Sequence, residues 1–177
     1  MARFILIIAL LSGFYVEAAE LPQGFSRIAK QCGSNPKALY AIALTESETA
    51  LTNGKSSVWP YSINWQGKPF LFQTRKEMYL FAEDLISKGY RSFDIGMMQV
   101  NWRWHSHRVN NLWELTDIKT NIRVACDILV EGYKAKGDWV LAAGFYHSPN
   151  NHTHSSNYIN RYKSKLSRIK LRGTNLN

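Results

Sequence analysis

The chain of 177 residues has little of what marks several common kinds of protein. It has only two cysteines, Cys32 and Cys126, and their wide spacing is not that of a zinc site. Acidic residues are few: 13 of them stand against 22 lysines and arginines, which gives a formal net charge of +9. No internal repeat or low-complexity linker divides the sequence, and no segment after residue 20 is apolar enough to span a bilayer. These features predict one basic, soluble domain without a bound metal.

The one apolar run stands at the N-terminus. Arg3 precedes an apolar stretch over residues 4–11, and small residues occupy the two positions of Val16-Glu17-Ala18 that a signal peptidase recognises. We therefore expect a signal peptide over residues 1–18 and a mature domain over residues 19–177, exported to the periplasm. The alternative is a membrane anchor, but the run is shorter than the roughly 20 residues that span a bilayer.

The positive charge favours an acidic partner. For an exported protein a polyanionic cell wall fits this better than nucleic acid does. A second concentration of charge lies near the C-terminus, where we expect the solvated face of a helix. Its members are Arg161, Lys163, Lys165, Arg168, Lys170 and Arg172.

The two cysteines each fall on the apolar face of a predicted helix. An even number in an oxidising compartment suggests that Cys32 and Cys126 form a disulfide. Two buried free thiols are the alternative that the sequence leaves open.

Helices dominate the predicted elements, and the fold class is α+β, predominantly α. Asn35 is expected to cap a helix that Pro36 opens, and Thr74 with Glu77 forms a capping box for another. A β-hairpin is expected over residues 61–72, around a turn at 66–69. The predicted helices cover residues 23–32, 36–47, 74–88, 96–101, 118–135, 138–146 and 156–170, with one or two turns within 103–115.

Glu46 is the one carboxylate on an apolar helix face, since it continues the series of Leu39, Ile42 and Ala43. Burial and the nearby helix C-terminus both disfavour its ionised form, so they raise its pKa. A general acid that protonates a glycosidic oxygen needs such a carboxyl. The alternative is a boundary glutamate that pairs with a lysine or arginine. Glu48, two residues on, is expected to point into solvent.

Several segments then resemble the signature blocks of lysozyme-like lytic transglycosylases. They are Thr45-Glu46-Ser47 at a helix end, Asp94-Ile95-Gly96-Met97-Met98-Gln99-Val100-Asn101, Ala143-Gly144-Phe145-Tyr146-His147-Ser148, and Tyr158-Ile159-Asn160. The blocks span about residues 24–170. The resemblance implies a lysozyme-like fold, with the hairpin as a small insertion.

By this resemblance Glu46 is the sole catalytic acid and base, acting on the glycan strands of peptidoglycan. A hydroxyl of muramic acid itself attacks the anomeric carbon, so the product has an anhydromuramic end, and neither a metal nor an organic cofactor is needed. A monomer suffices. The residues expected to line the sugar site are Ser47, Met97, Met98, Gln99, Asn101, Tyr146 and Tyr158.

The chain departs from the family pattern in two places. His147-Ser148-Pro149 stands where the family usually has asparagine, alanine and glycine. This variant resembles the exported transglycosylases that accompany conjugation and secretion machines, which implies such an apparatus as a partner. Residues 57–90 also lengthen the gap between the glutamate and glutamine blocks, and are expected to form one wall of the cleft.

Three other functions stay open. Asp94 matches the second catalytic carboxylate of animal-type lysozymes, so a true hydrolase that uses Glu46 and Asp94 is one alternative. A non-catalytic module that binds the wall through tryptophans such as Trp102 and Trp104 is another. Metal chemistry is the weakest, because no carboxylate or cysteine completes a ligand set. The histidines in question are His105, His107, His147, His152 and His154.

Overall fold

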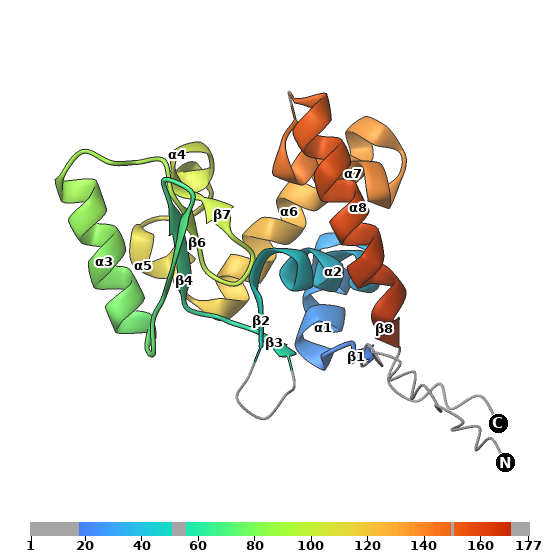
Figure 1. Cartoon of the computed structure of the whole chain (residues 1–177), viewed down its shortest axis with the longest axis horizontal. Helices are drawn as coiled ribbons and strands as arrows, with labels where there is room; N and C mark the ends of the chain where they lie inside the picture. Colours follow the sequence, from blue (N-terminus) through green and yellow to red (C-terminus); the bar gives the residue numbers. More distant parts are fainter. Residues whose placement is uncertain (1–17, 51–55, 150, 171–177) are drawn as a thin grey trace, which may run out of the picture.

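The computed structural model describes residues 18–50, 56–149 and 151–170. Most of them are helical, and the predicted class, α+β with helix predominant, is confirmed. In Figure 1 a small sheet with α3, α4 and α5 lies on one side, and α1, α2, α7 and α8 lie on the other. The long helix α6 (Ile118–Lys136) reaches from one part to the other.

The helical part is built around α2 (Pro36–Ser47). All residues from Ala38 to Leu44 are buried, because α1 (Gln23–Cys32), α6 and α8 (His152–Arg168) surround this helix. Its start is fixed locally: the Asn35 side chain accepts hydrogen bonds from the backbone N–H groups of Lys37 and Ala38. The predicted bounds of α1 and α2 are confirmed.

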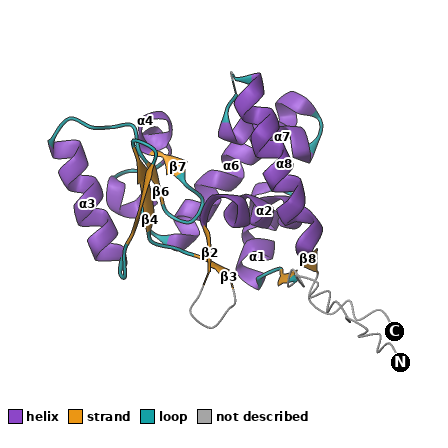
Figure 2. Cartoon of the chain, viewed as in Figure 1, coloured by secondary structure: helices purple, strands orange, loops and turns teal. Residues whose placement is uncertain are grey.

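Four antiparallel strands form the main sheet in the order β5-β4-β6-β7. The predicted hairpin is confirmed as β4 (Ser62–Trp65) and β5 (Lys68–Leu71). Gln66 and Gly67 between them both have positive φ, as a tight two-residue hairpin turn requires. Figure 2 shows the sheet strands gathered beside α3 (Arg75–Ser87), which begins at the predicted capping box of Thr74 and Glu77.

The helix predicted over residues 96–101 is wrong. This segment is instead a tight turn followed by β7 (Val100–Asn101), which pairs with β6 (Asp94–Ile95). Gly96 and Gln99 have positive φ, which interrupts any helix. Ile95 also pairs with Ile63 of β4, so the longer-range sheet decides the local conformation.

Short elements follow the sheet: α4 (Trp102–His105), a 3₁₀ turn (Ser106–Arg108) and α5 (Leu112–Leu115). The turns predicted within 103–115 are confirmed. The long helix α6 and α7 (Trp139–His147) also agree with the sequence to within one residue at each end.

The last helix was predicted too late in the chain. It begins at His152, because the Asn151 side chain caps it by accepting from the His154 N–H, and it ends at Arg168. The next two residues form β8 (Ile169–Lys170), which pairs in parallel with β1 (Ala19–Glu20). Two further short strands, β2 (Glu48–Ala50) and β3 (Ser56–Val58), pair directly after α2.

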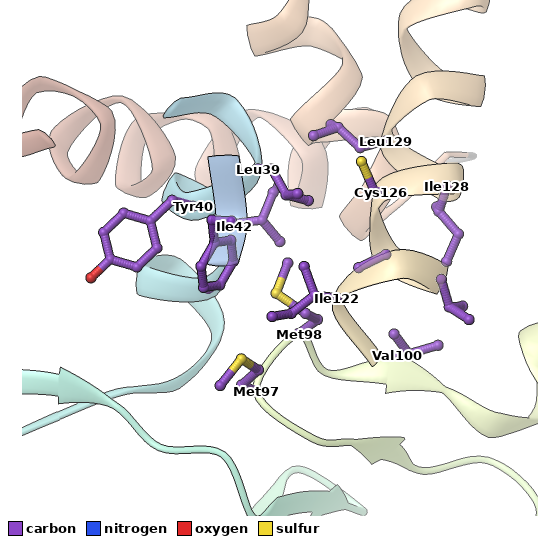
Figure 3. Packing of buried hydrophobic residues seen from close by; sticks show 14 of the residues in the cluster. Leu39, Tyr40, Ile42, Met97, Met98, Val100, Ile122, Cys126, Ile128 and Leu129 are labelled. Atoms are coloured by element: carbon purple, nitrogen blue, oxygen red, sulfur yellow. The ribbon is translucent and has the colours of Figure 1, made fainter. Parts of the chain in front are cut away.

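The core joins the two sides of the molecule. Figure 3 shows Met98 from the β6–β7 turn between Leu39 and Ile42 of α2 and Ile122 of α6. All four side chains are buried, and Met98 is completely so. The turn is therefore packed directly against the helix that carries Glu46.

A disulfide links α1 to α6. Cys32 and Cys126 are bonded, with their Cα atoms 6.3 Å apart. The cross-link closes a loop with a sequence separation of 94 residues, so it restricts the unfolded chain strongly.

Two expectations concern the chain ends. The predicted signal peptide lies outside the described residues apart from Ala18, and Arg172 of the C-terminal basic group also lies outside them. Among the helices of the described part, none has both the length and the apolar character needed to cross a membrane.

Candidate active site

Glu46 lies in the last turn of α2, one residue before the helix ends. The residues that precede it on the same face, Leu39, Ile42 and Ala43, are fully buried, whereas Glu46 itself is only partly exposed. The sequence thus predicted the position correctly: a carboxyl at the edge of an apolar face, where the helix meets the sheet.

The pKa of Glu46 is raised from its ordinary value to about 7. Removal of the carboxyl from water is the largest cause, and the negative charge of Asp94 raises the pKa further. The Tyr158 hydroxyl and the positive charge of Arg161 act in the opposite direction. At neutral pH a large fraction of Glu46 is therefore protonated and able to donate a proton.

Tyr158 approaches Glu46 from α8. Its side chain is 1% exposed, and its hydroxyl has no hydrogen-bond partner at normal distance within the described residues. The same hydroxyl lowers the pKa of Glu46, so the two groups face one another. The His147 ring stacks on Tyr158 with ring centres 4.4 Å apart, and the Arg161 guanidinium lies 5.6 Å from the Tyr158 ring centre. Tyr158 is therefore held by one residue of α7 and by one residue of its own helix.

Tyr146 comes from α7 and ties that helix to the β6–β7 turn. Its hydroxyl donates a 2.6 Å hydrogen bond to the Met98 carbonyl oxygen. Burial raises its pKa well above the ordinary value, and the charges of Glu46 and Asp94 add to this. Tyr146 thus lies near both carboxyls.

Asp94 lies in β6 across the site from α2. The Asn101 amide of β7 donates a 2.8 Å hydrogen bond to its carboxyl. Burial raises the pKa of Asp94, and this hydrogen bond lowers it. Asn64 of β4 pairs with Asp94 on the other side, so Asn64, Asp94 and Asn101 form one polar row across the sheet. Asp94 and Asn101 were identified from the sequence, but Asn64 was missed. The only sequence feature that could have pointed to Asn64 is its place in the alternating pattern of the strand.

The Asn101 amide oxygen is buried and accepts no hydrogen bond from any described residue. A buried acceptor without a donor is costly in free energy. It therefore marks a place in this polar row where a ligand hydroxyl or N–H could donate.

Gln99 closes the turn between β6 and β7. Its side-chain amide donates to the Ser62 hydroxyl at 3.0 Å and to the Gly96 carbonyl at 2.8 Å. These bonds turn the amide N–H group toward the protein and compensate for the positive φ of Gln99. Gln99 thus stabilises the turn between β6 and β7 through its side chain.

Two expected lining residues are placed differently. Met98 is fully buried in the core and cannot form the floor of a sugar site, although Met97 beside it is 8% exposed. Ser47 is also buried, and its hydroxyl donates to the carbonyl oxygens of Met97 at 2.7 Å and Ala43 at 3.2 Å. Both residues position the turn against α2 and do not present a group to a ligand.

Asn121 of α6 is a structural support that sequence reasoning missed. Its side chain accepts from the Met98 N–H at 3.0 Å and donates to the Ile95 carbonyl at 3.0 Å. A Cβ atom on Gly96 would lie 2.6 Å from the same amide, so only glycine fits there. In the sequence, only one feature could have identified Asn121: it is a polar residue next to Ile122 on the buried face of a helix.

Glu48 is not the solvated residue that the sequence predicted. Its side chain is 10% exposed and binds both Arg168, at 2.9 Å, and Lys165 of α8. Two cations of the C-terminal basic group thus point inward. The helix ends at Ser47 and the chain enters β2 at Glu48. The Glu48 side chain therefore does not point in the direction that a continued helix would give it.

The segment 57–90 contributes β4 and β5 to the sheet and α3 behind it. Asn64, in β4, is the residue of this segment that enters the polar row with Asp94. The segment thus borders the site through one strand.

Of the histidines, His147 lies at the site, stacked on Tyr158, whereas His105 and His107 contact one another. The rings of His105 and His107 are 6.5 Å apart, and the nearer contact of His105 is a hydrogen bond that it accepts from Arg108. In the described ranges, no three residues among His, Cys, Asp and Glu come together as a metal site would need.

Comparisons with models of known families, with curated proteins and with solved structures gave no match to this chain. The function is therefore argued from the geometry of the site.

Proposed function

We propose that the protein is a peptidoglycan lytic transglycosylase in which Glu46 is the catalytic acid and base. One observation carries the proposal: Glu46 is desolvated at a helix end, and its pKa is raised to about 7. Such a carboxyl can exist in both protonation states near neutral pH, so it can give a proton in one step and take one back in the next.

In the first step the protonated Glu46 donates its proton to the oxygen between N-acetylmuramic acid and N-acetylglucosamine. The bond from that oxygen to the anomeric carbon breaks as the substrate's N-acetyl oxygen attacks that carbon. In the second step the ionised Glu46 takes the proton from the C6 hydroxyl of the same muramic acid, whose oxygen displaces the N-acetyl oxygen. The product is the anhydro sugar, no water is consumed, and one protein carboxyl serves both steps.

The neighbours of Glu46 suit these two states. The Tyr158 hydroxyl lowers the pKa of Glu46, which means that it stabilises the carboxylate formed after the first proton transfer. Arg161 acts in the same direction by its charge. Burial and Asp94 favour the protonated form needed at the start.

The polar row of Asn64, Asp94 and Asn101 faces the helix end and offers amide groups to sugar hydroxyl and N-acetyl groups. Within this row the buried Asn101 amide oxygen has no donor among the residues that the structure describes. We propose that a substrate hydroxyl or N–H supplies it. No cofactor or metal enters this chemistry.

A hydrolase of the lysozyme type is the second candidate, because Asp94 influences the Glu46 pKa and so lies within electrostatic reach of it. In that reaction Asp94 must be ionised to act on the anomeric carbon. Burial raises the pKa of Asp94, but the 2.8 Å hydrogen bond from the Asn101 amide lowers it and so favours the ionised form.

The proposed setting is the periplasm. A signal peptide over residues 1–18 and a net charge of +9 suit an exported enzyme that works on the polyanionic wall. Local opening of the wall for a secretion or conjugation apparatus is the proposed role, supported by the resemblance of the His147-Ser148-Pro149 variant.

The direct test of the acid is Glu46→Gln, which keeps the size of the side chain and removes its titratable proton. We expect release of soluble fragments from purified peptidoglycan to fall at least about a thousandfold, since both steps need the carboxyl. The matched control is Glu20→Gln, an exposed carboxylate in β1. Unchanged release by Glu46→Gln would overturn the assignment of the acid.

A further inference from the structure

A surface hollow of about 470 Å³ lies at one end of the sheet, apart from the residues around Glu46. Trp65 and Gln66 of the β4–β5 hairpin, the loop of residues 89–92 and Arg103 of α4 form its walls. In Figure 1 this loop runs from the end of α3 across to β6, on the side of the sheet where α4 lies. The volume falls in the range of about 300–1,000 Å³ that is usual for small-ligand sites.

Two arginines, Arg91 and Arg103, bring positive charge to the hollow, and the Arg103 guanidinium lies 5.1 Å from the centre of the Trp104 ring. Within the described ranges, neither Arg91 nor Arg103 forms an ion pair with an acidic side chain. Four of the described arginines have such partners, whereas the hollow is lined by two arginines that have none among the described residues. The arginines bound to an acidic residue are Arg75, Arg108, Arg123 and Arg168.

Aromatic rings form the apolar part of the hollow. Trp65 and Tyr90 lie with ring centres 5.0 Å apart, and Tyr90 is 44% exposed. Tyr90 therefore leaves a large apolar surface in water at the mouth of the hollow, where small apolar groups of a ligand can cover it.

The strand register places this hollow beyond the polar row of the site. Asp94 pairs with Asn64 and with Asn101, and the ladder continues through a 2.9 Å hydrogen bond from the Trp102 N–H to the Phe93 carbonyl oxygen. Beyond this bond the strands end, and Ser92, Gln66 and Arg103 line the hollow together. Ser92 lies two residues before Asp94, and two residues along a strand correspond to about 7 Å.

We propose that the hollow binds the carboxylate end of the short peptide that branches from the glycan strand. This inference rests on the proposed function and deepens it, because it names what the enzyme recognises besides sugar. Arg91 and Arg103 bind the carboxylate, and Trp65 and Tyr90 cover the small apolar side chains of the peptide.

The free carboxylate of an unsubstituted muramic acid is the other source of the same chemistry. That group is joined to the sugar by a short lactyl arm with one methyl group, which is too small to cover both Trp65 and Tyr90. The Trp65–Tyr90 ring pair and the hollow of about 470 Å³ both favour the peptide carboxylate over the carboxylate of muramic acid.

The test measures dissociation constants by calorimetry on the chain carrying Glu46→Gln, so that the ligand is not cleaved. The ligands are a two-disaccharide glycan fragment with its peptides, the same fragment after an amidase has removed them, and the free peptide. The variants are Arg91→Gln with Arg103→Gln, and the matched control is Arg27→Gln. Arg27 is an exposed arginine of α1 and is in no ion pair within the described part.

We expect the double variant to bind the peptide-bearing fragment about tenfold more weakly, and the stripped fragment within about twofold of the parent. The control changes neither. An equal loss on both fragments, no loss on either, or the same loss in Arg27→Gln overturns the proposal. If the parent binds neither glycan fragment, the proposed function fails. The free peptide then tests the hollow alone, since its binding must still fall in the double variant.

Discussion

The Ser47 hydroxyl donates a 2.7 Å hydrogen bond to the Met97 carbonyl oxygen and thereby fastens the end of α2 to the β6–β7 turn. Ser47 directly follows Glu46, and Met97 lies three residues after Asp94 in the chain. One buried hydroxyl thus sets the spacing between the two carboxyl-bearing segments.

Ser47→Ala should therefore affect both stability and activity. The Met97 carbonyl loses its donor in a buried position, which costs about 1–3 kcal/mol of unfolding free energy. Without this bond the turn can shift relative to Glu46. We therefore expect kcat to fall even under conditions in which the variant is fully folded. The control is Ser87→Ala, which removes an exposed hydroxyl bonded to Asp84 at the end of α3. Equal effects from the two variants would speak against a positioning role for Ser47.

Asp94→Asn tests the electrostatic link between the carboxyls. Asp94 raises the pKa of Glu46, so its removal should lower that pKa. Cleavage needs protonated Glu46, and the rate falls as pH rises through about 7. The alkaline limb of the pH profile should therefore move to lower pH in Asp94→Asn, while the product keeps its anhydro end. Loss of all cleavage in this variant, with the fold intact, would instead favour the hydrolase.

The raised pKa of Glu46 also predicts how stability depends on pH. Glu46 has a folded-state pKa of about 7 against 4.5 for the ordinary group, so its favourable contribution is complete below 4.5 and is lost as pH rises through 7. Glu46→Gln removes this loss. Relative to the parent, its unfolding free energy should increase by on the order of 3 kcal/mol between about pH 4 and about pH 8. Glu20→Gln, which changes an exposed carboxylate, should show no such trend.

Glu48→Gln should be strongly destabilising. It leaves the positive charges of Lys165 and Arg168 without their carboxylate at a site where Glu48 is 10% exposed. Removal of one partner from a buried ion pair costs about 3–5 kcal/mol, whereas an exposed pair contributes less than about 1 kcal/mol. Asp84→Asn breaks the exposed pair with Lys88 and serves as the control in the same chemical denaturation experiment. A loss no larger than in the control would mean that α8 is held by other contacts.

Local signals in the sequence predicted much of the helical framework. The Asn35 cap and the Thr74–Glu77 capping box act within a few residues of their own backbone, so the sequence alone identifies them. Glu46 was also identified locally, because three apolar residues on one helix face precede it. The same local reasoning failed at residues 96–101, where the pairing of Ile95 with Ile63 decides the structure from more than thirty residues away.

The supports of the site were harder to predict, since they are long-range contacts. Nothing near Asn121 in the sequence shows that its amide binds Met98 and Ile95. Glu48 was expected in solvent because it points away from the Glu46 face of the helix, and its partners Lys165 and Arg168 lie more than a hundred residues later. The sequence thus identified the reacting group better than the residues that hold its surroundings in place.

The product of the reaction tests the central claim most directly. Purified peptidoglycan is digested with the protein, and the soluble fragments are weighed by mass spectrometry. We predict fragments ending in anhydromuramic acid, about 18 mass units lighter than hydrolysed ones because no water is added, and none from Glu46→Gln under the same conditions. Fragments that carry only reducing, fully hydrated ends would contradict the account and identify the protein as a hydrolase.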